Sequence, residues 1–288
     1  MGLISHDAVA DYYDSLDFLY REAWGLRLHH GQFRSPEDSI AAALIRHENH
    51  IVSRLELTGG LRVCDIGCGY GVLARRLAVE FGCRVDGFTV SGNQHRVAVR
   101  RCRAPGVTFH HADWLANRLE PDSIDRIACV ETLFHIQDPE RAVREMGRVL
   151  APGGVAVLAG WFLPERGPSA LEKLTKQPIE NGVRNLGKLL RLATVTRFLQ
   201  GAGLAIERHE VVTAAVRPTL LRLGCRAAPV ALASSEFWIL ARRRPGRLAG
   251  LAAAACAVAA GYGFRGLDYA IATVRKAGPP LGVRAARP

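Results

Sequence analysis

The sequence lacks the cysteine patterns that bind metals or form disulfide frameworks. Its seven cysteines are odd in number and include neither a CxxC pair nor a cluster with histidine. This argues against a disulfide scaffold or a metal site and is typical of thiols that pack as small apolar residues in a reducing compartment. The first residues, MGLISHDAVADYYDSLD, have neither the basic start nor the apolar stretch of a secretory signal. We therefore expect a cytoplasmic protein that binds no metal.

Acidic residues are scarce in the last quarter of the chain. Between Thr213 and Pro288 there are twelve Lys and Arg residues but only two acidic ones, Glu236 and Asp268, so this quarter holds most of the net charge of +11. Three interpretations stay open: peripheral contact with an anionic membrane, attraction of an anionic acceptor such as a diphosphate, and an ordinary solvated surface.

The sequence also has no apolar run of the length that crosses a bilayer. The best candidate, from Leu248 to Phe264, is 17 residues long, consists mostly of Ala and Gly, and lies between Arg247 and Arg265. A span needs about 20 strongly apolar residues, so we expect a tightly packed, alanine-rich helix. The basic residues are not interleaved with aromatic ones on a recognisable nucleic-acid-binding module, and nucleic acid is therefore not an expected partner.

What the sequence does contain is the composition of a folded α/β protein. Its 288 residues are 49% hydrophobic and 23% charged, which favours one α/β core of roughly 200 residues with additions. Residues 1–57 show helical spacing that is interrupted by WGLRLHHGQFRSPED, where Ser35, Pro36 and Glu37 indicate a helix start. We interpret this part as an N-terminal helical cap.

Short apolar runs alternate with helical patterns between residues 58 and 213. The five runs are LRVCDI, CRVDGFTV, VTFHHAD, IDRIACVE and VAVLAGWF. This alternation predicts an α/β fold with a Rossmann-like, doubly wound sheet. A polar segment around 163–192 indicates a lid or insertion. Residues 214–288 are expected to form a basic helical extension with a final strand, for which EFWILARRR and LDYAIATVRK both qualify; we favour the second.

A glycine-rich turn follows the first of these runs. In DIGCGYG, the residues Gly67, Gly69 and Gly71 let the backbone approach a ligand and turn into a helix. Asp65, two residues before the first glycine, places a carboxylate at the end of the strand, where it suits a ligand that carries an ammonium group. A dinucleotide fingerprint is spaced G-x-G-x-x-G and binds a pyrophosphate, which this carboxylate would repel.

These residues resemble the first motif of class I S-adenosylmethionine-dependent methyltransferases, and the resemblance spans about residues 10 to 213. DGFTVSGNQHRVAVRR, HHADWL, CVETLFHIQD and LAPGGVAVLAGW resemble the later motifs of the subgroup that contains cyclopropane-fatty-acid synthases and the tocopherol, sterol and natural-product methyltransferases. The segment YYDSLDFLYREAWGLRLHHGQF is similar to the N-terminal part of the tocopherol and natural-product branch. The resemblance implies that the cofactor is S-adenosylmethionine.

The resemblance also implies a cofactor site. Asp65 and Gly67 would recognise the methionine end, and Gly69 and Gly71 would shape the turn. The remaining contacts would be Ser91 and Gln94 near the ribose, Asp113 on the adenine amino group, Trp114 beside the adenine ring, and Tyr13 on the methionine carboxylate. Alternatives stay open for three of them: Ser91 as a helix cap, Gln94 as a solvated residue and Trp114 as part of the core.

His135 is the candidate base, because it follows the fourth strand at the edge of the sheet where ligands collect and because imidazole titrates near neutral pH. The alternative is a histidine that caps a helix or fills the core. Glu131 is a candidate for stabilising a developing positive charge or for binding the cofactor. The candidate acceptor pocket consists of Trp24, His29, His30, Phe33 and Phe134.

The function that these features predict is methyl transfer to a small lipophilic acceptor: a terpenoid, prenylated, polyketide or aromatic natural product. Phe134 stands where cyclopropane synthases carry a glutamate, which favours plain methylation over cyclopropanation. We favour carbon over oxygen or nitrogen as the methylated atom. Two alternatives are a membrane-associated quinol or lipid methyltransferase and a catalytically silent S-adenosylmethionine-binding partner subunit. The apolar tail could cover the acceptor pocket, form a second core layer or provide the face of a homodimer.

Overall fold

The computed structural model describes residues 6–165, 189–263 and 266–279, so most of the predicted lid around 163–192 lies outside the described residues. A seven-stranded sheet in the order β3-β2-β1-β4-β5-β7-β6 forms the centre. Its strands are β1 (Arg62–Ile66), β2 (Arg84–Thr89), β3 (Val107–His111), β4 (Ile124–Val130), β5 (Leu150–Phe162), β6 (Leu204–Val211) and β7 (Asp268–Lys276). The five predicted strands and the Rossmann-like fold class are confirmed.

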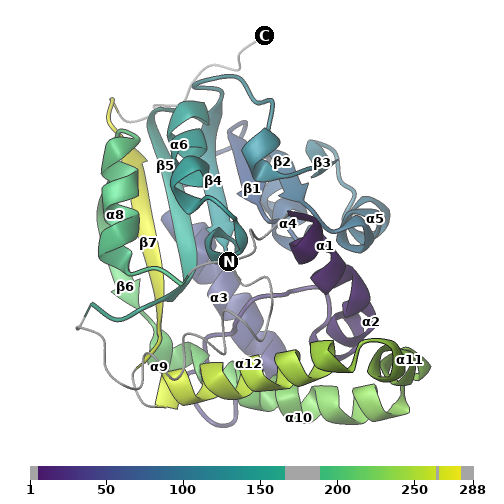
Figure 1. Ribbon diagram of the computed structural model, residues 1–288. Helices are drawn as coiled ribbons and strands as arrows, with labels where there is room; N and C mark the ends of the chain where they lie inside the picture. The colour runs from purple at the N-terminus through teal and green to yellow at the C-terminus, as the bar shows by residue number, and fades with distance from the viewer. Residues whose placement is uncertain (1–5, 166–188, 264–265, 280–288) are drawn as a thin grey trace.

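Helices cover both faces of this sheet (Figure 1). One face is covered by α3 (Ile40–Arg54) and α4 (Val72–Phe81), the other by α6 (Pro139–Val149) and α8 (Leu192–Gly201), and α5 (Gly92–Arg101) packs beside β2 and β3. Because both faces are buried, the central strands are nearly continuous apolar runs rather than alternating ones. Neighbouring strand residues accordingly enter different cores, as Val63 and Cys64 do.

The last strand enters the sheet between two earlier ones. β7 pairs antiparallel with β5 on one side and with β6 on the other. This confirms LDYAIATVRK as the final strand, whereas EFWILARRR falls mainly in the helix α11 (Ser235–Arg243). The strand places Tyr269 opposite Trp161, so a side chain from the end of the chain reaches the carboxyl edge of the sheet.

The remaining helices lie at this carboxyl edge (Figure 1). The cap begins with α1 (His6–Ser15), α2 (Asp17–Leu19) and the π-helix η1 (Tyr20–Trp24). After β6 come α9 (Thr213–Val216), α10 (Pro218–Ala233), α11 and α12 (Pro245–Gly263), while two short 3-10 turns, η2 (Trp114–Ala116) and η3 (Leu133–His135), follow β3 and β4. The helices α10 to α12 therefore lie across this edge, at the bottom of the view in Figure 1.

The predicted helix start at Ser35 is wrong. The helix α3 begins at Ile40, and the Ser39 hydroxyl caps it by accepting a hydrogen bond from the Ala42 N–H at 3.1 Å. The segment 35–38 is a turn instead, because the Asp38 carboxylate accepts the Arg34 N–H at 2.6 Å and holds the chain in a non-helical conformation.

The alanine-rich run forms α12, as predicted, but its packing is looser than expected. Ala257 and Val258 are buried, whereas Ala252, Ala253 and Cys256 are exposed. Among the described residues, no helix combines the length and the hydrophobicity that crossing a membrane requires. One side of α12 therefore packs on the protein and the other faces outward.

Two glycines of the turn after β1 allow a matched test of how this turn packs against the sheet. Gly69 and Gly71 both have positive φ, at 55° and 81°, but a Cβ on Gly71 would lie 2.5 Å from the Phe109 ring, whereas a Cβ on Gly69 would meet open space. We expect Gly71→Ala to destabilise the fold by about 3 kcal/mol, from left-handed strain and overpacking together. Gly69→Ala should lose only about 1–2 kcal/mol. Urea unfolding measures both, and equal losses would contradict the packing role of Gly71.

Candidate active site

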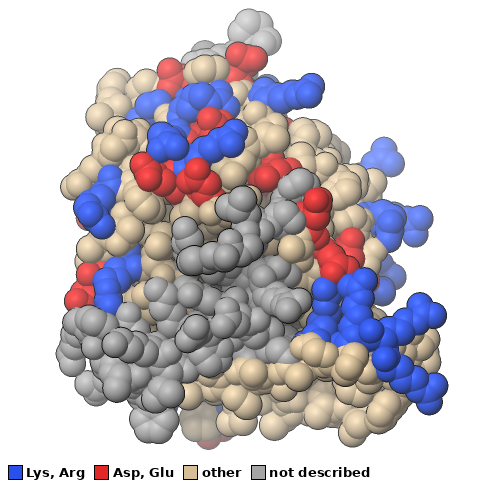
Figure 2. Space-filling model, viewed as in Figure 1, with Lys and Arg blue, Asp and Glu red and all other residues tan. Residues whose placement is uncertain are grey.

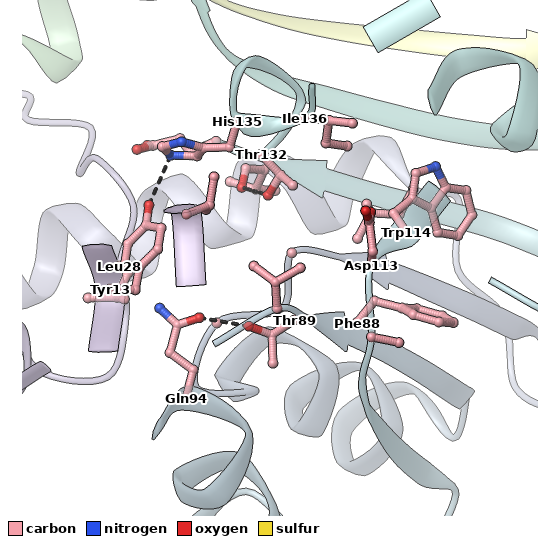
Figure 3. Close-up of a pocket in the computed structure, with 18 of the residues that line it drawn as sticks. Tyr13, Leu28, Phe88, Thr89, Gln94, Asp113, Trp114, Thr132, His135 and Ile136 are labelled. Carbon is pink, nitrogen blue, oxygen red and sulfur yellow. Dashed lines mark hydrogen bonds between the residues drawn. The ribbon is translucent and has the colours of Figure 1, made fainter. Parts of the chain in front are cut away.

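Three cavities meet at the carboxyl edge of the sheet. The first, of about 110 Å³, follows the ends of β1, β2 and β4 (Figure 3). A second, of about 60 Å³, joins it at Gly67 and Gly69. The third, of about 240 Å³, lies between the cap and α10, and it shares four residues with the first: Tyr13, Leu28, Glu131 and His135. An elongated ligand in the first two cavities would therefore meet a second ligand in the third.

One end of the first cavity is flat and aromatic. Phe88 and Trp114 line it and pack edge to face, with ring centroids 5.7 Å apart. Trp114 is 3% exposed, and its indole N–H donates to the Ala142 carbonyl. Asp113 also lines the cavity, and its Oδ1 accepts the Leu115 N–H at 2.9 Å. These walls suit a heteroaromatic ring, as the sequence predicted for Asp113 and Trp114.

Of the two residues predicted to lie near the ribose, one lines the first cavity and the other does not. Gln94 is buried and lines the first cavity, where its Oε1 accepts a hydrogen bond from the Thr89 hydroxyl at 2.8 Å (Figure 3). Ser91 does not line the cavity. Its hydroxyl caps α5 through the Gln94 N–H and donates to the Asp14 carboxylate. Ser91 is therefore the helix cap that the sequence left open as an alternative, and its one hydroxyl proton is already donated to Asp14.

The glycine turn borders the second cavity closely. A Cβ on Gly67 would lie 2.0 Å from Thr132 Oγ1, so no larger residue fits between the turn and the end of β4. Gly69 lines the first two cavities, whereas Gly71 packs against Phe109 and lines none of the three. Gly67 and Gly69 are therefore the turn positions whose backbone a ligand in these cavities would approach, whereas Gly71 packs inside the turn.

Asp65 lies in the second cavity with an unsatisfied atom. The residue is 3% exposed, and its Oδ2 has no hydrogen-bond partner. Burial, reinforced by the charge of Glu48, raises the pKa of Asp65 to about 7. A buried acceptor without a donor costs free energy, and an ammonium group would satisfy it. This orphan oxygen fits the methionine amino group that the sequence predicted here.

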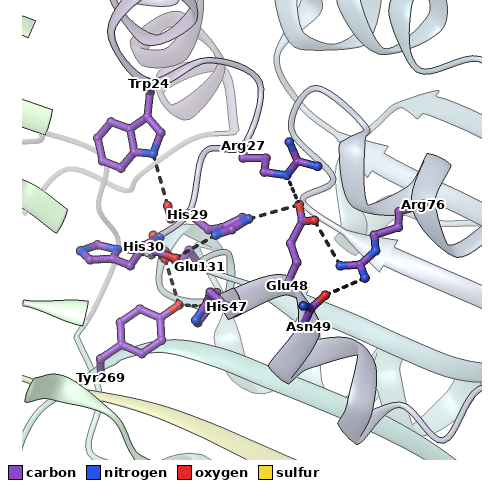
Figure 4. A network of polar contacts seen from close by, with 10 residues as sticks. All are labelled: Trp24, Arg27, His29, His30, His47, Glu48, Asn49, Arg76, Glu131 and Tyr269. Carbon is purple, nitrogen blue, oxygen red and sulfur yellow. Dashed lines mark hydrogen bonds and ion pairs between the residues drawn. The ribbon is translucent and has the colours of Figure 1, made fainter. Parts of the chain in front are cut away.

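A network of charged side chains includes residues that line the second cavity together with Asp65; Figure 4 shows this network. Glu48 of α3 accepts from Arg27 at 2.9 Å and from His29 Nε2 at 3.4 Å. Burial acts to lower the pKa of His29, but the hydrogen bond to Glu48, the negative charge of Glu48, the hydrogen bond to the His30 backbone and the charge of Glu131 together outweigh it, and the net shift is upward. His29 lines the second cavity and not the third. Its predicted place in the acceptor pocket is wrong, because the carboxylate of Glu48 holds the ring on the cofactor side.

Tyr13 and His135 form a hydrogen-bonded pair where the first and third cavities meet. The Tyr13 hydroxyl lies 2.9 Å from His135 Nε2 (Figure 3), and both residues line both cavities. Burial, with the charges of Tyr20 and Glu131, raises the pKa of Tyr13 well above its usual value, so the phenol stays neutral. The predicted base therefore has a neutral hydroxyl partner from the cap.

Glu131 also lines both cavities, directly after β4. Its carboxylate Oε1 accepts the His30 N–H at 2.6 Å, lies 2.9 Å from His30 Nδ1 and accepts the Tyr269 hydroxyl at 2.9 Å (Figure 4). Burial alone would raise the pKa of Glu131, but the charge and hydrogen bonds of His30 lower it to about 2. Its backbone is left-handed, with φ at 53°. Glu131 is a fixed negative charge rather than a base.

The third cavity is largely aromatic and aliphatic. Phe134 and Trp161 stack with centroids 5.1 Å apart and an interplanar angle of 8°. Trp24 and His30 line the cavity as predicted. The side facing α10 and α12 consists of apolar residues: Leu220, Leu223, Gly224, Ala227, Ala255 and Val258. Such walls favour a lipophilic ligand because they release water from apolar surface.

Phe33, which was predicted to line the acceptor pocket, lies elsewhere. Its ring packs under the Arg222 guanidinium, 4.5 Å from the ring centroid, and it does not line the third cavity. This cation–π contact fixes the loop before α3 against α10. Phe33 is therefore a structural residue.

Several residues of the site had not been predicted from the sequence. Tyr12 and Tyr20 line the third cavity and hydrogen-bond to each other at 2.8 Å, and the aromatic spacing of the cap was the available signal. Trp161 is the last residue but one of the predicted strand β5, and the direction of its ring had not been predicted. Tyr269 and Glu48 approach Glu131 and Asp65 from distant parts of the chain, and no local pattern indicates this.

Comparison with known proteins agrees with this geometry. Residues 64–158 match the family model described as a methyltransferase domain. The chain is 38% identical over 157 residues to the methyltransferase GfsG of Streptomyces halstedii, covering 52% of this chain and 56% of that protein. It is 32% identical over 215 residues to the 27-O-demethylrifamycin SV methyltransferase of Amycolatopsis mediterranei, covering 72% of this chain and 77% of that protein.

Among solved structures, the [4+2]-cyclase SpnF superposes with a TM-score of 0.80 at 26% identity, and the match covers 96% of this chain and 98% of that one. The sheet order and the glycine turn define the class I methyltransferase fold. The chain belongs to the S-adenosylmethionine-dependent methyltransferases, and its cofactor is S-adenosylmethionine.

Cofactor binding should depend on pH through Asp65. Its carboxyl, with a pKa of about 7, is neutral in acid and must ionise to pair with an ammonium group, so binding releases a proton. We expect the affinity for S-adenosylhomocysteine to fall about fifteenfold from pH 7 to pH 5.5, a range in which the amino group of the ligand stays protonated. Calorimetry at both values, in two buffers of different ionisation enthalpy, measures the affinity and the proton release.

Asp65→Asn is the control for this experiment. It keeps the shape of the side chain but cannot ionise, so its affinity should be lower at pH 7 and nearly flat across the range. A wild-type affinity that does not change, or an equal slope in Asp65→Asn, would assign the pH dependence to another group.

Proposed function

We propose that this protein methylates a small lipophilic natural product of the terpenoid, prenylated, polyketide or aromatic kind. The single observation that carries this proposal is the third cavity: an apolar, aromatic chamber that meets the cofactor cavity at Tyr13, Glu131 and His135. Methyl transfer requires an acceptor in line with the cofactor and without competing water. The junction of the two cavities would bring acceptor and cofactor together, and the apolar lining of the third cavity disfavours water there.

The cofactor would lie along the first two cavities. Asp65 would bind its amino end, the backbone at Gly67 and Gly69 would pass beneath it, and Gln94 would lie near the ribose. The adenine would lie against the aromatic end that Phe88, Asp113 and Trp114 line. S-adenosylmethionine supplies a methyl group that its sulfonium already activates, so the protein acts mainly by positioning and by handling charge and protons.

The charges around the junction favour carbon as the methylated atom. Methylation of an alkene leaves a cation in the acceptor, and the fixed carboxylate of Glu131 lies in the cavity wall where that charge would develop. Aromatic rings such as Tyr20 and Trp24 add cation–π stabilisation. The Tyr13 hydroxyl can then take the proton that the cation loses while its own proton passes to His135 Nε2.

A second candidate atom is oxygen. The relative with 77% coverage is named for O-methylation, and the same Tyr13–His135 pair could remove the proton of a hydroxyl acceptor. In this case the acceptor becomes neutral after transfer, and Glu131 contributes less. The two candidates therefore differ in how strongly the rate depends on the carboxylate of Glu131.

Incubation of the protein with methyl-labelled S-adenosylmethionine and extracts of the source organism tests the proposal. We expect label in one lipophilic product, and mass spectrometry with NMR of that product identifies the methylated atom. Cofactor binding without label in any metabolite would instead support a partner subunit, or an activity other than methyl transfer such as that of the similar cyclase.

With the labelled acceptor in hand, Tyr13→Phe tests the proton path. Loss of the hydroxyl should lower kcat by about a hundredfold, the usual scale for general acid–base catalysis. Tyr12→Phe is the matched control, because the neighbouring Tyr12 hydroxyl contacts Tyr20 and not His135, and its kcat should stay within about threefold. Equal kcat values for the two variants would remove Tyr13 from the mechanism.

A further inference from the structure

An exposed apolar surface lies on the outside of α10 and α11. Its members are Leu221, Cys225, Leu232, Trp238 and Ile239, which we call the outer face. Leu221 is 74% exposed and Leu232 62%. Four of the eight large apolar side chains that are exposed in the described chain belong to this face. Scattered apolar residues on a surface are ordinary, but a contiguous group indicates a binding surface.

The residues of the outer face lie next to one another on the two helices. Leu221, Cys225 and Leu232 lie at helical intervals of four and seven residues, so they follow one side of α10. The Trp238 indole N–H donates to the Leu232 carbonyl at 3.1 Å, which holds the ring against the end of α10. Ile239, 53% exposed, extends the surface along α11.

Exposed arginines border the outer face. Arg242 and Arg243 lie one turn after Trp238 and Ile239, and Arg226 lies on α10; all three are exposed and form no ion pair with a described residue. By contrast, Arg244 and Arg247 both bind Asp11. Figure 2 shows arginine atoms gathered at the end of the molecule where α11 lies, beside uncharged atoms along α10 and α12.

Acidic residues are scarce around the outer face. Glu236 is the acidic residue of α10 and α11, and its carboxylate already accepts from the hydroxyls of Ser234 and Ser235. In a symmetric dimer through the outer face, the same surface of both copies would be buried, so the arginines of both copies would enter one interface in which Glu236 is the acidic residue of each. An anionic bilayer instead complements the arginines and also accommodates apolar and indole side chains.

The helix behind the outer face also borders the acceptor cavity. Leu220, Leu223 and Ala227 of α10 line that cavity, while Leu221 and Cys225 point outward. One layer of helix therefore separates the outer face from the cavity. A lipophilic acceptor partitions into a bilayer, so docking there would place the cavity next to its supply; this step alone depends on the proposed function.

We propose that the outer face docks this protein onto the surface of a bilayer that contains anionic lipid, with Trp238 and Ile239 entering the interface and Arg226, Arg242 and Arg243 contacting lipid phosphates. The attachment is peripheral, because no described helix is long and apolar enough to span. It is reversible by salt, since exposed charges are screened over about 10 Å at 0.1 M ionic strength.

Flotation of the full chain with vesicles tests this docking. The vesicles contain phosphatidylcholine alone or with 30 mol per cent phosphatidylglycerol, in about 0.05 M and 0.5 M salt. We expect binding to the anionic vesicles at low salt. Trp238→Ser with Ile239→Ser should lower the partition coefficient at least about tenfold. Arg242→Ser with Arg243→Ser should lower it about fivefold per charge on anionic vesicles only.

Two control variants match these changes in chemistry. Val79→Ser with Val99→Ser removes exposed apolar residues on α4 and α5, and Arg100→Ser with Arg101→Ser removes exposed cations on α5; all four sites lie outside the outer face. Both should float like the wild type. Wild-type protein that stays unbound with anionic vesicles at low salt, or outer-face variants that bind as the controls do, would overturn the proposal.

Analytical sedimentation tests the alternative that a second copy of this chain, rather than a bilayer, covers the outer face. If wild type is a dimer and Trp238→Ser with Ile239→Ser is a monomer, the outer face joins two copies and the membrane proposal is wrong. Calorimetry with S-adenosylhomocysteine should give the same affinity for every variant, because none of these residues lines the cofactor cavities. Unchanged cofactor binding with lost flotation would thus leave the proposed function untouched.

Discussion

The carboxylate of Glu131 is the interaction on which the site depends. It is a negative charge inside the protein, and it stays ionised only because donors from distant segments converge on it. His30 comes from the cap and Tyr269 from the last strand, whereas Glu131 itself follows β4 in a left-handed conformation. Cap, central strand and final strand must therefore all be in place before the wall between the two main cavities exists.

Glu131 lies between cavities whose linings differ in polarity. On the cofactor side, backbone glycines, Gln94 and the charged group around Asp65 and Glu48 offer many polar contacts. On the acceptor side the lining is aromatic and aliphatic, and its polar groups cluster at the junction. Polar contacts suit a cofactor with charged and hydrogen-bonding groups, whereas apolar walls suit a lipophilic ligand with few directional demands. Tyr13, Glu131 and His135 line both chambers, at the place where the proposed transfer would occur.

The core and the cofactor turn could be predicted from the sequence because their signals are local. The run VCDIGCGYG specifies a strand, a tight turn and a helix within ten residues, and the alternation of runs identifies the sheet. The acceptor side could not be predicted in the same way. His29 and His30 are neighbours in the chain, but Glu48 holds one ring and Glu131 the other, so they enter different cavities. Phe33 and Ser91 likewise depend on partners, Arg222 and Asp14, that only the folded chain brings near.

The position of β7 has a consequence for how the chain reaches this structure during synthesis. Within the described residues β6 pairs only with β7, and β7 is the last of the described strands in chain order, so it leaves the ribosome after the other six. Until it does, β5 and β6 each present an open edge to the solvent, which is a hazard for association with other chains. The same nine residues deliver Tyr269 to Glu131. In a nascent chain truncated before residue 268, β5 and β6 would each lack this partner strand and Glu131 would lack the Tyr269 hydroxyl, so the pairing of the sheet and the hydrogen bonding of the cavity wall depend on the same segment.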